Sequence, residues 1–157
     1  MHFNIKNSIA LRLVIIAIFA ISSLLVLKGV VDYFSQKAEI IENTENIIHR
    51  ASTRLQLNLP SPLWNYNNDI IENIVKSELD APDVFSIKVT NVDKEIAYQG
   101  ASSEGFGGDT VTVKLIFTED DTENDVGQVS LVANQELIEK KLAALLGKII
   151  FDVIFVD

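Results

Sequence analysis

The stretch from Leu11 to Val31, near the amino terminus, constrains this chain more than any other part of its sequence. It reads LRLVIIAIFAISSLLVLKGVV, 21 residues in which only Arg12 and Lys28 are charged. At about 1.5 Å of rise per residue, a helix of this length covers roughly the 30 Å of a bilayer core. Both charged side chains lie within about one helical turn of an end, where they can reach the headgroup region. The sequence therefore predicts a transmembrane helix over 11–31.

A cleaved signal peptide is the main alternative to this anchor. The strictly uncharged stretch, Leu13 to Leu27, has 15 residues, which is the length of a signal-peptide core. No A-x-A-like cleavage site follows it, however, and a helical pattern continues from Asp32 to Leu59. A soluble core helix is disfavoured because a chain of 157 residues rarely encloses a helix that is apolar on all sides. We therefore expect an uncleaved anchor.

The orientation of the anchor does not follow from counting basic residues. Lys6 and Arg12 on one side of the span are matched by Lys28 and Lys37 on the other. A short tail over 1–10 is most simply left in the cytoplasm. The remainder contains every one of the 22 acidic residues of the chain. We expect 32–141 to be an exported domain.

Composition excludes several classes of function. The formal net charge is -9, and a strongly acidic chain without a basic face does not bind nucleic acid non-specifically. The chain has no cysteine, which excludes disulfides, thiolate metal sites and a cysteine nucleophile. We predict no cofactor and no metal site.

The carboxyl-terminal segment 142–157 is apolar again. Its sequence, LAALLGKIIFDVIFVD, is interrupted by Lys148 and Asp152 and is too short to span a bilayer. We interpret it as the start of a truncated second transmembrane helix. The alternative is an amphipathic helix that lies in the membrane interface.

A helical stripe follows the anchor. Phe34, Ile41, Ile48 and Leu55 recur every seven residues, which is the spacing of a helix that pairs with a second copy of itself. The same stripe could instead pack on the sheet of its own domain. With only three repeats, the two interpretations are equally favoured.

The middle of the chain combines helix and strand patterns. Pro60 and Pro62 are expected to end the long helix, and Asn67 or Asn68 to cap a second helix over 69–79. Beyond Asp83 the apolar period changes to two, which predicts four strands joined by short connections. The expected strands cover 84–90, 95–99, 111–117 and 128–133, with a flexible loop over 100–109 and an acidic turn over 118–126. The fold class is α+β, with an antiparallel sheet of about four strands and a closing helix.

Two segments carry a resemblance to a known group of proteins. They are LPSPLWNYN from Leu59 to Asn67, and DAPDV from Asp80 to Val84 with the strand, turn and strand that follow to Gly100. This pattern resembles the extracytoplasmic sensor region of bacterial membrane signalling proteins, chiefly sensor histidine kinases and diguanylate cyclases of two-component and related systems. The resemblance implies a PAS-like or Cache-like domain between two transmembrane helices, with the chain stopping before the output domain.

The resemblance also implies a function. We expect a sensory input module in the bacterial inner membrane, with the domain over 32–141 in the periplasm, that detects a small ligand or envelope cue. The expected partners are the lipid bilayer and a second copy of the chain. No constellation of residues supports catalysis, so we expect no enzymatic activity. The alternative is a membrane-tethered adaptor that binds a partner protein.

Three aromatic residues are the candidate ligand-binding residues: Trp64, Tyr66 and Tyr98. For Trp64, which lies between a proline turn and a helix start, a role as a core anchor is favoured over a pocket. Five carboxylates between Glu119 and Asp125 fail the EF-hand template and predict a solvated turn. His49 is expected to be a surface residue.

Overall fold

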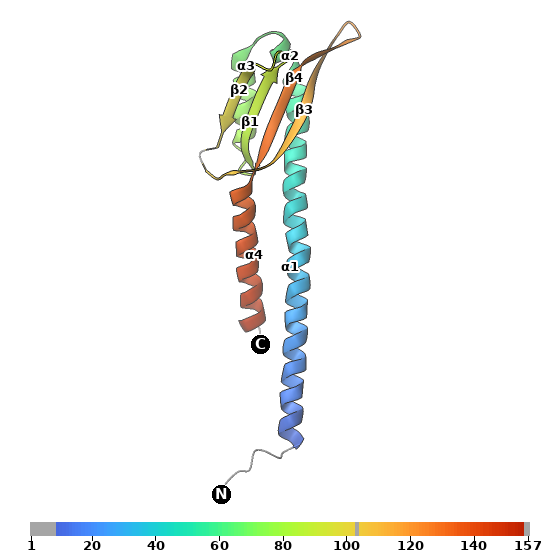
Figure 1. Ribbon diagram of the computed structural model, residues 1–157, viewed down its shortest axis with the longest axis vertical. Coiled ribbons are helices and arrows are strands. Elements are labelled where there is room, and N and C mark those ends of the chain that lie inside the picture. Colours follow the sequence, from blue (N-terminus) through green and yellow to red (C-terminus); the bar gives the residue numbers. More distant parts are fainter. Residues whose placement is uncertain (1–8, 103, 156–157) are drawn as a thin grey trace. The chain divides into compact units, whose positions relative to one another are not determined.

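In a computed structural model, the described residues are 9–102 and 104–155. They form four helices and four strands (Figure 1). In chain order these are α1 (Ile9–Asn58), α2 (Pro60–Trp64), α3 (Asn68–Leu79), β1 (Val84–Asn91), β2 (Ile96–Ala101), β3 (Gly107–Glu119), β4 (Thr122–Asn134) and α4 (Gln135–Phe155). The strands form one antiparallel sheet in the order β2-β1-β4-β3. The predicted α+β class and antiparallel sheet are confirmed.

The chain divides into two compact units. The helical unit comprises 1–38 together with 143–157, and the sheet unit comprises Glu39–Leu142. The helical unit contains residues 9–38 of α1 and residues 143–155 of α4. The sheet unit contains the rest of α1, all four strands, α2, α3 and the first turns of α4.

The predicted apolar helix exists, and its apolar side chains face outward. Phe19 is 74% exposed and Leu24 is 66% exposed, whereas the core helix of a soluble protein buries such side chains. Within the described residues, α1 is the one helix long and apolar enough to cross a membrane. Length and composition are the evidence, and a signal sequence near the amino terminus meets the same criteria. α4 is a helix throughout 135–155, but it does not meet them.

Prolines end α1 as predicted. α1 stops at Asn58, and Pro60 then starts α2 at a position where a helix needs no backbone N–H donor. Helical hydrogen bonds continue across the boundary between α1 and α2. The Leu59 amide donates to the Leu55 carbonyl at 2.9 Å, and the Leu63 amide donates to the Leu59 carbonyl at 3.0 Å. The prediction for α3 is also confirmed, since the Asn67 side chain caps it by accepting from the Ile70 amide.

Helices cover one face of the sheet, and the core lies between this face and the helices. α3 packs over β1 and β2, and α2 packs over β3 and β4. The opposite face is lined by polar side chains such as Lys88 and Lys114, and Thr112 and Ser130 share a hydrogen bond of 2.9 Å there. Fifteen buried apolar residues form the core: Ile48, Ala51, Leu55, Leu59, Leu63, Ile71, Val75, Val84, Ile87, Val89, Leu115, Val126, Val129, Leu131 and Ala133.

Strands β3 and β4 are longer than predicted. The acidic segment expected as a turn over 118–126 is mostly strand, and the turn itself consists of Asp120 and Asp121 with φ angles of 50° and 60°. Such left-handed pairs join antiparallel strands because their twist matches that of the hairpin. The loop expected over 100–109 is also shorter, because β2 continues to Ala101 and β3 begins at Gly107. Backbone pairing between strands overrides the weak strand propensity of Gly and Asp in both places.

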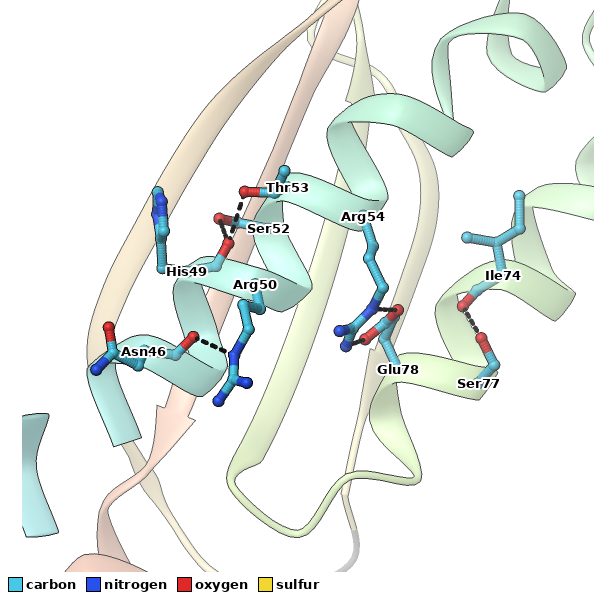
Figure 2. Close-up of polar contacts among 9 residues, drawn as sticks. All are labelled: Asn46, His49, Arg50, Ser52, Thr53, Arg54, Ile74, Ser77 and Glu78. Carbon is cyan, nitrogen blue, oxygen red and sulfur yellow. Dashed lines mark hydrogen bonds and ion pairs between the residues drawn. The ribbon is translucent and has the colours of Figure 1, made fainter. Parts of the chain in front are cut away.

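An ion pair joins α1 to α3 beside the core. The Arg54 guanidinium donates two hydrogen bonds to the Glu78 carboxylate (Figure 2), and their lengths are 2.7 Å and 2.5 Å. This hydrogen bonding raises the pKa of Arg54 further above its usual value. Glu78 is largely buried, so the pairing neutralises a carboxylate that would otherwise be costly to place there.

We predict that Leu55→Ala destabilises the sheet unit by about 2–5 kcal/mol, because Leu55 is fully buried and its truncation leaves a cavity. Leu57→Ala is the matched control. Leu57 lies in the same helix and is 76% exposed, so its truncation should change stability by less than about 0.5 kcal/mol. Urea unfolding of the detergent-solubilised chain, followed by the fluorescence of its single tryptophan, measures both values. Equal effects of the two substitutions would contradict this placement of α1.

Candidate functional site

The three candidate aromatic residues do not share one pocket. Trp64 is 40% exposed and stacks on Phe117 of β3, with ring centroids 5.5 Å apart. Tyr98 belongs to β2, at the opposite edge of the sheet, and packs against the core. Tyr66 is 85% exposed. The structure places Trp64 at the surface, which corrects the expectation of a core anchor, because stacking on Phe117 covers only part of its ring system.

Of the three candidate aromatic residues, Tyr66 alone lines a small groove. The groove has a volume of about 150 Å³ and lies beside the β1–β2 turn, where Asn91, Glu95 and Ile96 also line it. Ligand binding by Trp64, Tyr66 and Tyr98 stays a prediction.

The heptad stripe on α1 is divided between two environments. Ile48 and Leu55 are 3% and 0% exposed and belong to the core of the sheet unit. Packing on the domain's own sheet therefore accounts for these two residues. Phe34 and Ile41 are 63% and 37% exposed, so these two residues of the stripe are accessible to a second copy of the chain. Pairing with a second copy stays a prediction.

The acidic hairpin and the histidine behave as surface features. Among residues 9–102 and 104–155, no group of three or more His, Cys, Asp or Glu side chains could hold a metal ion. Within the hairpin, Asp125 accepts from the Gly127 amide at 3.0 Å and lies 3.6 Å from the Lys114 ammonium. His49 is exposed on α1, and its backbone carbonyl accepts from the hydroxyls of Ser52 and Thr53 (Figure 2).

Asn134, the last residue of β4, forms three hydrogen bonds through its side chain. Its side chain is buried and donates to the carbonyl of Pro82 at 3.1 Å and to that of Glu104 at 3.4 Å. Its side-chain oxygen accepts from the Leu137 amide at 3.3 Å, which caps the first turn of α4. One side chain thus joins the α3–β1 turn, the β2–β3 loop and α4.

Backbone and charged contacts strengthen this junction. The Asn134 amide donates to the Asp83 carbonyl at 2.9 Å, and the Gln135 amide donates to the Phe106 carbonyl at 3.0 Å. The ammonium group of Lys141, six residues after Gln135 in α4, binds the largely buried Asp83 carboxylate at 2.7 Å. The start of α4 is therefore held to two loops of the sheet unit by five hydrogen bonds or ion pairs that involve Asn134, Gln135 or Lys141.

Gly105 makes this close packing possible. A Cβ atom at Gly105 would lie 2.3 Å from Oδ1 of Asn134, and the residue has a φ of +100°. Any side chain here would push Asn134 away from the carbonyls that it binds.

We call this arrangement the α4 junction and define it by Asp83, Gly105, Asn134 and Lys141. A groove of about 110 Å³ lies beside it, lined by polar residues that include Ser102 and Glu136. The contacts of the α4 junction are hydrogen bonds and one ion pair, and they link α4 to two loops of the sheet unit. Sequence reasoning missed it because the capping role of Asn134 was hidden by a strand that runs directly into a helix. An Asn one residue before the amphipathic stretch from Gln135 was the available signal.

Comparison with known proteins adds no relative. No model of a protein family matches the sequence, and no curated protein matches it significantly.

We predict that Asn134→Ala destabilises the sheet unit by about 2–4 kcal/mol, since it removes a helix cap and leaves two carbonyls without their donor. Gly105→Ala should have a loss of similar size, because its methyl group would displace the Asn134 side chain. Asn46→Ala, at an exposed position on α1, is the control and should change stability by less than about 0.5 kcal/mol. Urea unfolding curves decide between the outcomes. A neutral Asn134→Ala would remove the α4 junction from consideration.

Proposed function

We propose that this chain is the sensory input part of a bacterial membrane signalling receptor, of the kind that precedes a histidine kinase or a diguanylate cyclase. In this proposal 11–31 anchors the chain in the inner membrane, and 32–141 is a PAS-like or Cache-like domain in the periplasm. The segment 142–157 begins a second span. The domain detects a small ligand or envelope cue, pairs with a second copy, and has no enzymatic activity of its own.

One observation carries this proposal: both helices of the helical unit continue into the sheet unit without a flexible linker. α1 is a single helix from Ile9 to Asn58, and its buried residues Ile48 and Leu55 belong to the core. α4 begins at the residue after β4 and is held by the α4 junction. In this proposal, a change in the packing of the sheet unit is passed on along these two continuous helices.

The relay works by a shift of populations in this proposal. A ligand moves the helices only if it binds one arrangement of the domain more tightly than another. The β2–β3 loop is a suitable element for such a difference, because Glu104 and Phe106 in it contact Asn134 and Gln135 directly. Movement of this loop would alter the start of α4.

The orientation is tested by labelling introduced cysteines, which are unique because the chain has none. We expect a cysteine at Lys94, which is exposed in the β1–β2 turn, to react with a membrane-impermeant maleimide in intact bacterial cells. A cysteine at Asn4 should react only after the cells are permeabilised. The reverse pattern would place the sheet unit in the cytoplasm and overturn the periplasmic sensor.

The relay is tested by a distance measured within the helical unit. Spin labels at Ser35→Cys on α1 and Gly147→Cys on α4 occupy exposed positions, and nothing lies within 4 Å of where a Cβ of residue 147 would be. We expect Asn134→Asp, which keeps an acceptor at the helix cap but loses the two donated hydrogen bonds, to shift the distance distribution by about 1–2 Å. Leu57→Ala serves as the control background. An unchanged distribution in a folded Asn134→Asp variant would contradict the relay.

A further inference from the structure

The two helices of the helical unit approach each other closely at Gly29. A Cβ atom there would lie 3.0 Å from Cγ2 of Val153 and 3.4 Å from Cγ2 of Ile149. Small residues at such crossings allow membrane helices to pack without a gap. Gly29 is the only glycine of α1, so this crossing is defined by one position in the sequence.

A charged groove lies on one side of this crossing. It has a volume of about 410 Å³, and four charged residues line it: Lys28 and Asp32 of α1, and Lys148 and Asp152 of α4. In each helix the lysine precedes the aspartate by four residues, so the two side chains lie on one helix face. The groove on the other side of the crossing has about 390 Å³ and contains none of these charges, since residues such as Val30, Leu146 and Ile150 line it.

α1 and α4 run in opposite directions (Figure 1), and this arranges the four charges in an alternating pattern. Gly29 meets both Ile149 and Val153, so Lys28 lies near the level of Asp152, and Asp32 lies near the level of Lys148. The groove therefore presents two positive and two negative groups with a formal charge of zero. In the described part of the chain none of these four side chains forms an ion pair or a hydrogen bond with another side chain.

The groove lies where the hydrocarbon region would end. The uncharged stretch of α1 runs from Leu13 to Leu27, and Lys28 is the first charged residue after it. Unpaired charges at this depth are costly unless they meet a group of opposite charge. The groups available in quantity at this depth are phospholipid headgroups.

We propose that this groove binds the headgroup of a zwitterionic phospholipid with a primary amine, of the phosphatidylethanolamine type. Lys28 and Lys148 bind the phosphate, and Asp32 and Asp152 bind the ammonium group. An anionic headgroup such as phosphatidylglycerol offers the phosphate and uncharged glycerol hydroxyls, and it leaves both aspartates without a cationic partner. The inference rests on insertion of α1 into a bilayer and is independent of any sensory role.

The test is native mass spectrometry of the detergent-solubilised full chain with dioleoyl-phosphatidylethanolamine or dioleoyl-phosphatidylglycerol. We expect the unmodified chain to retain about threefold to tenfold more phosphatidylethanolamine than phosphatidylglycerol. A few partly exposed ion pairs give a preference of about this size. Asp32→Asn with Asp152→Asn should abolish this preference. Lys28→Gln with Lys148→Gln should reduce retention of both lipids.

The control pair is Lys37→Gln with Glu39→Gln, which changes one charge of each sign on α1 outside the groove and should leave the preference intact. Equal retention of the two lipids by the unmodified chain would overturn the proposal. So would a preference that survives the double Asp→Asn change.

A second measurement excludes simple pairing of the four charges with one another. We expect the effects of Lys28→Gln and Asp152→Asn on the melting temperature to be additive in lipid-free detergent. They should become non-additive when phosphatidylethanolamine is bound, because one headgroup then couples the two residues. Non-additivity without lipid that phosphatidylethanolamine leaves unchanged would assign the charges to a direct interhelical contact and overturn the lipid site.

Discussion

The rest of the structure depends on α1 being one helix that meets two different environments. No proline occurs before Pro60, and Gly29 is the only glycine between Ile9 and Asn58, so nothing in the sequence interrupts the backbone hydrogen bonding. Over 11–31 the apolar residues point in all directions, as they do in a helix surrounded by lipid. Beyond Glu39 the apolar residues are concentrated on the side of α1 that contains Ile48 and Leu55, and this side packs into the core. The helix that is proposed to anchor the chain is therefore also a structural part of the domain.

At the carboxyl-terminal end of the sheet unit, α4 is joined to the domain by side-chain contacts in place of a buried helix face. β4 passes into α4 without a linker residue, and the change from strand to helix leaves backbone groups that need new partners. Asn134 satisfies one of them as a cap while it holds two loops, and Lys141 adds the contact with Asp83. Because Asn134 and Asp83 are both buried, these contacts are shielded from water and are stronger than the surface ion pairs of the chain. Exposed pairs such as Lys140 with Glu136 contribute little by comparison.

The charged residues Lys148 and Asp152 of α4 lie close to charged residues of α1. Lys148 and Asp152 interrupt an apolar stretch, and in the sequence alone they weaken the case for a second span. In the helical unit they line the same groove as Lys28 and Asp32, at the end of the uncharged stretch of α1. The residues that are least favourable in an isolated helix are thus gathered on one side of a helix crossing, where groups of opposite charge can reach them.

Local sequence determined the elements of this protein, and tertiary contacts determined their roles. The run from Leu11 to Val31 is long and apolar enough to specify an exposed helix, and Pro60 and Asn67 mark helix ends because their effects act within a few residues. Alternation of apolar residues likewise predicts four strands. Strand ends depend on pairing with a neighbour, which is why β3 and β4 extend beyond the predicted 111–117 and 128–133. The place of Trp64 at the surface, the burial of Ile48 and Leu55, and the meeting of Asn134 with Pro82 and Glu104 all join residues far apart in the chain. Such contacts depend on how the elements pack in three dimensions, and no local pattern in the sequence records that packing.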